Sequence, residues 1–194
     1  MLTPGESISS VRKILVRVNN WIGDVVMISP AMRAVRKAFP EAEITLLAKT
    51  WVLDALRGSP YYDHLIEYDR EGDHATWHGR WKLIERLRKE RFDLALLFQK
   101  AFEAGLFARM ARIPRRVGFQ SDSRGWLLTD PLPLPREGHH AEQFLRIVEA
   151  VGVEVADRRL SYHLAPQARD GALRFLAKHG IHQGALRIAL HPGA

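Results

Sequence analysis

Short apolar runs alternate along this chain with longer segments in which apolar residues recur every three or four positions. The first run covers residues 14–18, and a helical pattern over 28–39 follows before Pro40 interrupts it. A second apolar run at 44–48 completes a strand–helix–strand unit. Because such crossovers are right-handed between parallel strands, this unit predicts the start of a parallel sheet.

The same alternation continues almost to the last residue. Further strands are expected at 64–68, 93–98, 115–119 and 160–164, and further helices at 52–57, 80–91, 101–111, 140–151 and 167–179. This order predicts the α/β class, with a Rossmann-like doubly wound parallel sheet. We expect residues 1–180 to form one domain. Residues 181–194, with an apolar run at 186–190, are expected to hold a linker and the first strand of a second, truncated domain.

Composition limits the classes of function. The chain has 194 residues, 46% of them hydrophobic, so it can bury a core, and it has no cysteine for disulfides or thiolate metal sites. Its formal net charge of +7 favours an anionic partner: nucleic acid, phospholipid or an acidic sugar. Nucleic acid is disfavoured because basic and aromatic residues are not interleaved as a stacking platform.

The N-terminal segment carries Pro4, Glu6, Arg12 and Lys13, which interrupt the apolar core of a secretory signal. The apolar runs are also far shorter than the roughly 18 residues that span a bilayer. We therefore expect a cytoplasmic protein, with membrane contact limited to peripheral binding.

The turn after the first strand is the leading candidate site. Ligands of open parallel sheets bind beyond the carboxyl ends of the strands, and Asp24 lies there beside Gly23, where the backbone can approach a ligand closely. A carboxylate at this point can accept a proton from a bound hydroxyl. Its alternative role is to cap the following helix through its side chain.

Five arginines lie within sixteen residues: Arg109, Arg112, Arg115, Arg116 and Arg124. Their guanidiniums can form paired hydrogen bonds with phosphate or carboxylate, supplemented by Arg80 and Trp81, or they can form a solvated charged face. The dinucleotide and P-loop glycine motifs are absent from the sequence. His74 and His78 indicate a solvated loop rather than a metal site.

Four segments together carry a resemblance to a known family. ILVRVNNWIGDVVMISPAMRAVRKAFPEAEITLLA, with its W-x-G-D turn, resembles the opening of the ADP-heptose:lipopolysaccharide heptosyltransferases, glycosyltransferase family 9. RRVGFQSDSRGWLLTD is similar to a segment of the heptosyltransferase II type, His139 and Glu142 match an H-x-x-E motif, and the terminal HPGA resembles the start of the family's nucleotide-sugar domain.

The resemblance implies the N-terminal, acceptor-binding half of a GT-B glycosyltransferase that moves heptose from ADP-heptose to the lipopolysaccharide inner core with inversion. It implies no metal and no other cofactor, and Asp24 as the general base. The implied acceptor-binding residues are Asn20, Trp21, Gly23, Arg80, Lys100, Arg115, Arg116, Arg124 and His139, and the implied donor-binding residues are His191, Pro192 and Gly193.

Relatives of the type II enzyme often carry Asn-Ser-Phe-Lys where this chain has residues 100–103, so acceptor contacts there depart from the pattern. The 194 residues alone are expected to be inactive, since most of the donor site would lie beyond them. Two alternatives remain: a non-catalytic acceptor-binding fragment, and a related transferase that uses another sugar donor.

Overall fold

The computed structural model describes residues 10–135 and 137–182, and the single positions 184, 186, 188 and 190. It contains two compact units, the first ending at His163 and the second starting at Leu164. The helix expected at 167–179 therefore lies in the second unit, as α7 (Pro166–Lys178). The assignment of an acceptor domain and a nucleotide-sugar domain stays a prediction.

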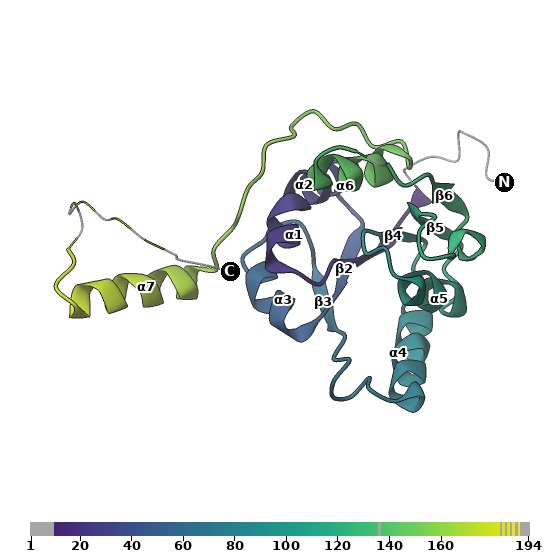
Figure 1. Ribbon diagram of the computed structural model, residues 1–194, viewed down its shortest axis with the longest axis horizontal. Coiled ribbons are helices and arrows are strands. Elements are labelled where there is room, and N and C mark those ends of the chain that lie inside the picture. The colour runs from purple at the N-terminus through teal and green to yellow at the C-terminus, as the bar shows by residue number, and fades with distance from the viewer. Residues whose placement is uncertain are drawn as a thin grey trace. The chain divides into compact units, whose positions relative to one another are not determined.

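A six-stranded parallel sheet forms the centre of the first unit, with the strand order β3-β2-β1-β4-β5-β6 (Figure 1). Its strands are β1 (Lys13–Arg17), β2 (Glu43–Ala48), β3 (His64–Glu67), β4 (Leu94–Leu97), β5 (Arg115–Phe119) and β6 (Asp130–Leu132). The order reverses between β1 and β4, as in doubly wound folds. The predicted fold class is confirmed.

Helices cover both faces of this sheet (Figure 1). Apolar residues of α1 (Ile22–Met27), α2 (Ser29–Ala38), α3 (Thr50–Leu56) and α6 (His140–Glu149) form one buried cluster with the strands, and those of α4 (Trp77–Glu90) and α5 (Phe102–Met110) form the other. Strands buried from both sides read as continuous apolar runs, which is why their positions follow from the sequence.

The structure contains one strand that the sequence analysis did not predict, and two expected strands differ from it. The proline-rich stretch around residue 131 forms the edge strand β6, preceded by a 3₁₀ turn, η2 (Gly125–Leu127). Proline is compatible with an edge strand because one side of its backbone has no partner. The predicted strand at 160–164 is wrong, because that segment has no regular structure. In the predicted run 186–190, the described positions 186, 188 and 190 are exposed and outside any strand.

Side-chain hydrogen bonds, rather than pairing with a strand, hold the segment 157–161 against α2 within the first unit. The Arg33 guanidinium on α2 pairs with the Asp157 carboxylate and donates to the Ser161 hydroxyl at 3.0 Å. The Ser161 N–H donates to the Ser29 hydroxyl at 2.9 Å. These contacts explain the error at 160–164: the segment satisfies its polar groups through α2, so its alternating pattern does not mark a strand.

Candidate active site

The loops that follow the strands all reach one edge of the sheet, because the strands are parallel. Asp24 lies at this edge in the first turn of α1 and is 8% exposed. The N-cap residue of α1 is Trp21, whose carbonyl accepts the Asp24 N–H at 3.1 Å, and no side chain caps the helix. Capping thus does not account for Asp24. The described part of the chain offers its carboxylate no hydrogen bond or ion pair.

A cavity of about 280 Å³ opens at the same edge. Its lining comes from the ends of β1 to β5: Asn20, Lys49, Tyr68, Arg70, Gln99, Ala101, Phe102, Glu103 and Asp122. Hydrogen-bonding groups of several kinds thus line one cavity. The lining residue nearest to Asp24 in the sequence is Asn20, four positions earlier. Such a lining, with two cationic and two anionic side chains among amide and hydroxyl groups, suits a ligand with many hydroxyl groups.

Gln99 Oε1 is a buried polar atom of this lining without a hydrogen-bond partner among the described residues, whereas the buried Tyr68 hydroxyl has the Glu103 carboxylate beside it. Buried polar groups are normally paired, so Gln99 Oε1 can accept a hydrogen bond from an incoming ligand group. Burial, together with the neighbouring Glu103 carboxylate, raises the pKa of Tyr68 to about 12. The hydroxyl therefore stays protonated at neutral pH and can donate a hydrogen bond.

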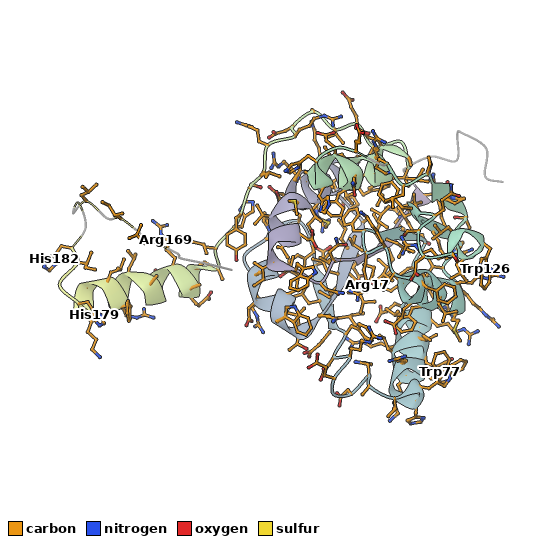
Figure 2. All side chains as sticks on the ribbon, in the orientation of Figure 1. Arg17, Trp77, Trp126, Arg169, His179 and His182 are labelled. Atoms are coloured by element: carbon orange, nitrogen blue, oxygen red, sulfur yellow. The ribbon has the colours of Figure 1, made fainter. Side chains whose placement is uncertain are left out.

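Arg17 is the last residue of β1 and is labelled near the middle of the first unit in Figure 2. It is buried, and its guanidinium donates to the carbonyls of Val18 at 2.9 Å and Leu47 at 3.0 Å, and to Asn20 Oδ1 at 3.4 Å. The guanidinium carbon also lies 5.3 Å from the centre of the Tyr68 ring, within cation–π range. Burial lowers the pKa of Arg17 to about 10, which still leaves it charged at neutral pH.

Arg124 reaches this edge from β5 but is fully buried. Its guanidinium donates to the carbonyls of Phe119 at 2.9 Å, Gln99 at 2.6 Å and Ala101 at 3.0 Å. Burial lowers the pKa of Arg124 to about 10, partly offset by the charge of Asp122. In this structure the side chain joins two loops of the site, whereas we expected it to face an acceptor.

Arg115 and Arg116 lie at the opposite edge, since they begin β5. Arg115 pairs with Asp130 at 3.4 Å, and Arg116 is buried and donates to the Leu127 carbonyl at 2.7 Å. Burial lowers the pKa of Arg116. The expected arginine cluster therefore does not form one surface, because its members occupy both edges of the sheet and two of them are buried.

The remaining predicted residues are divided in the same way. At the carboxyl edge, Asn20 lines the cavity, Trp21 and Gly23 are exposed, and Arg80 forms an ion pair with Glu103 at 3.6 Å. Lys100 follows β4 and donates to Gln143 Oε1 at 2.7 Å. His139 caps α6 by accepting the Ala141 N–H at 3.2 Å. The predicted donor residues His191, Pro192 and Gly193 lie outside the described residues.

All five tryptophans follow the carboxyl end of a strand. Trp21 follows β1, Trp51 follows β2, Trp77 and Trp81 follow β3, and Trp126 follows β5. Each is at least 42% exposed, although tryptophan is usually among the most buried residues on average. Figure 2 shows Trp77 and Trp126 at the outside of the unit. The exposed indoles thus mark the same edge as Asp24 and the cavity.

Comparison with known proteins identifies the family of this chain. The profile of glycosyltransferase family 9 (heptosyltransferase) matches residues 80–181, more than half of the chain. The chain belongs to this family. Lipopolysaccharide heptosyltransferase 2 of Escherichia coli K12 is 30% identical over 125 residues, which are 64% of this chain and 36% of that protein. Lipooligosaccharide heptosyltransferase 2 of Campylobacter jejuni (strain 81116) is 23% identical over 187 residues, 94% of this chain and 50% of that protein.

Solved structures of the family share the fold. The glycosyl transferase family 9 structure from Veillonella parvula has a TM-score of 0.78 at 22% identity, over 89% of this chain and 51% of that one. The Escherichia coli ADP-heptose lps heptosyltransferase II has a TM-score of 0.70 at 22% identity, over 88% and 51%. This family 9 chain spans about a third to a half of the length of the curated relatives it matches.

Several residues at the edge of this family 9 domain escaped prediction. Arg17 and Tyr68 sit within apolar strand patterns, Gln99 follows one directly, and Trp51 begins a short helix. The one available signal was position, because each lies at or just after the carboxyl end of a strand, where ligands of such sheets bind.

Proposed function

We propose that this chain is the acceptor-binding half of an inverting heptosyltransferase, with ADP-heptose as donor and the lipopolysaccharide inner core as acceptor. The observation that carries the proposal is the Asp24 carboxylate, which has no described partner and belongs to the turn and helix that follow Asn20, a residue that lines the polar cavity. Membership of a heptosyltransferase family supports the reaction class, and the names of the relatives support the acceptor.

In the proposed reaction, an acceptor heptose hydroxyl attacks the anomeric carbon of ADP-heptose while Asp24 takes its proton. The bond from that carbon to the ADP oxygen breaks on the opposite face, so the configuration inverts and ADP leaves with the bonding electrons. General-base assistance of this type is worth about 10²- to 10⁴-fold in rate. We propose that neither a metal nor another cofactor takes part.

The cavity is the proposed place for the acceptor. Gln99 Oε1 is buried without a described partner and is suited to a sugar hydroxyl, while Lys49 and Arg70 are suited to phosphate or carboxylate groups on the core. Of the predicted acceptor residues, Asn20 has the most support, since it lines this cavity.

We place this reaction in the cytoplasm, with peripheral contact at the inner membrane, where a lipid-anchored acceptor would lie. Within the described ranges, no helix is both long enough and apolar enough to cross a bilayer. An electrostatic surface contact would weaken as salt rises, because the screening length is about 8 Å at physiological ionic strength.

The test is heptose transfer to a heptose-bearing core acceptor by this chain and by a version extended through the rest of the family's length. Asp24→Asn is made in each form, with Asp54→Asn as the control because Asp54 is an exposed carboxylate on α3. We expect transfer by the extended form alone, lowered about 10²- to 10⁴-fold by Asp24→Asn and unchanged by Asp54→Asn. Full activity of Asp24→Asn would refute the assigned base.

A further inference from the structure

Asn20, which lines the cavity, is held from two sides. The Trp51 indole N–H donates to the Asn20 backbone carbonyl at 2.8 Å, and the Arg17 guanidinium donates to Asn20 Oδ1 at 3.4 Å. Trp51 belongs to α3 and Arg17 to β1, so the two contacts tie the β1–α1 turn to two different elements. Neither contact involves Asp24 directly.

Trp51 is not placed there by core packing. Its side chain is 47% exposed, and the Lys49 ammonium lies 4.4 Å from the centre of its ring, in cation–π geometry. A half-exposed indole usually leaves its N–H to water. Here the N–H is directed at a loop carbonyl, with Lys49 holding the ring from its face.

The helix that carries Asp24 needs such support. It has six residues, Ile22–Met27, and no capping side chain, and its N-cap is Trp21, the residue directly after Asn20. Isolated helices much shorter than about 12 residues are marginal in water, so contacts with neighbouring elements have to hold the orientation of α1. A turn fixed at Asn20 fixes the N-cap of α1 one residue later, and Asp24 lies in the first turn of the helix.

We infer that Trp51 is a positioning residue for Asp24: its bond to the Asn20 carbonyl holds the start of α1, and with it the carboxylate. The inference rests on the proposed function in one respect, since it takes Asp24 as the base. Trp51 acts through the turn and touches no reacting atom. Two other roles are possible for an exposed indole at this edge, direct contact with the acceptor and simple stabilisation of the fold.

The key variant is Trp51→Phe, which keeps an aromatic ring for Lys49 and removes the N–H donor. Trp126→Phe is the matched control, because Trp126 is also exposed at this edge and touches Phe102 through its ring. Both are made in the extended protein, alone and combined with Asp24→Asn. Initial rates are measured against acceptor concentration, and hydrogen exchange is followed over residues 22–28.

We expect Trp51→Phe to lower kcat about three- to tenfold, the worth of one hydrogen bond, with the acceptor KM unchanged within about twofold. In the Asp24→Asn background the same change has no further effect, because the two residues act in series. Exchange over 22–28 becomes faster in Trp51→Phe and stays unchanged in Trp126→Phe.

Three results would overturn the inference. An equal loss of kcat in the Asp24→Asn background would indicate a role independent of Asp24, and a rise in acceptor KM at constant kcat would indicate direct contact with the acceptor. The third is an unchanged rate in Trp51→Phe. If the unmodified extended protein transfers no heptose, the proposed function fails separately. The positioning role of Trp51 is then tested by hydrogen exchange alone, and unchanged protection over residues 22–28 in Trp51→Phe refutes it.

Discussion

Replacing Arg124 should lower the stability of the first unit much more than replacing a surface arginine would. The side chain is fully buried, and its guanidinium serves three backbone carbonyls, those of Phe119, Gln99 and Ala101. In Arg124→Ala the Ala101 carbonyl keeps the Ala104 N–H at 3.1 Å and the Phe119 carbonyl keeps the Ser121 hydroxyl at 3.5 Å. The Gln99 carbonyl loses its donor, and a space remains where the side chain was. An unsatisfied buried acceptor costs about 1–3 kcal/mol, but water that enters the space recovers part of that.

We therefore expect Arg124→Ala to lower the free energy of unfolding by about 3–5 kcal/mol. Arg124→Lys should lower it by about 2 kcal/mol, because one ammonium keeps the charge but cannot reproduce the planar fork of donors. Urea unfolding followed by circular dichroism measures both changes, with calorimetry as a second probe. Arg109→Ala is the matched control from the same arginine-rich stretch. Arg109 is exposed, so its loss should cost less than about 0.5 kcal/mol.

A loss below about 1 kcal/mol for Arg124→Ala would refute the structural role of this side chain. If such a variant also bound acceptor more weakly, the sequence-based assignment of Arg124 to the acceptor would be restored. An unfolded Arg124→Ala chain leaves Arg124→Lys to decide between the two roles. A stable Arg124→Lys protein with normal acceptor binding would also contradict the predicted loss.

Two further predictions concern contacts away from the site. Burial disfavours the Asp63 carboxylate, but the Ile44 N–H and the Arg36 guanidinium outweigh it and lower the pKa of Asp63. The resulting stability is present above the unfolded-state pKa of about 3.9 and lost as pH falls through the lower folded value. Asp63→Asn should thus cost about 1 kcal/mol at pH 7, and the difference should shrink below about pH 4 in urea unfolding. Arg33→Ala should release the segment 157–161, which contains two arginines, and should speed trypsin cleavage there severalfold. Mass spectrometry of the fragments measures this rate, and unchanged cleavage would contradict the anchoring role of Arg33.

Periodicity was sufficient for the fold because the four central strands, β1, β2, β4 and β5, are buried from both sides and the crossover helices have apolar faces. It failed at β6 and at 160–164, where side-chain contacts rather than burial decide the conformation. Asp130–Leu132 pairs with β5 despite a proline, whereas 160–164 alternates like a strand but is held by α2. Neither outcome is visible in local sequence.

The place of the candidate site in the fold was predictable from the sequence, and the side chains that the structure brings together there were only partly predictable. Asp24 follows from its place after β1 and from the W-x-G-D resemblance. Arginines cannot be assigned in this way, because a guanidinium has the same sequence signature whether it faces a ligand or a backbone carbonyl. Arg116 and Arg124 are used in the second way. Trp51 carries no motif, and its importance depends on the 2.8 Å contact with a loop thirty-one residues earlier.

The distribution of the indoles gives the protein a built-in optical probe. Since every tryptophan lies in a segment that follows the carboxyl end of a strand and is at least 42% exposed, the tryptophan emission reports on the segments that follow those strand ends. A ligand that covers these segments should shift that emission to the blue and protect it from acrylamide quenching. Binding elsewhere on the molecule would leave the spectrum unchanged, so binding at these segments can be followed without any added label.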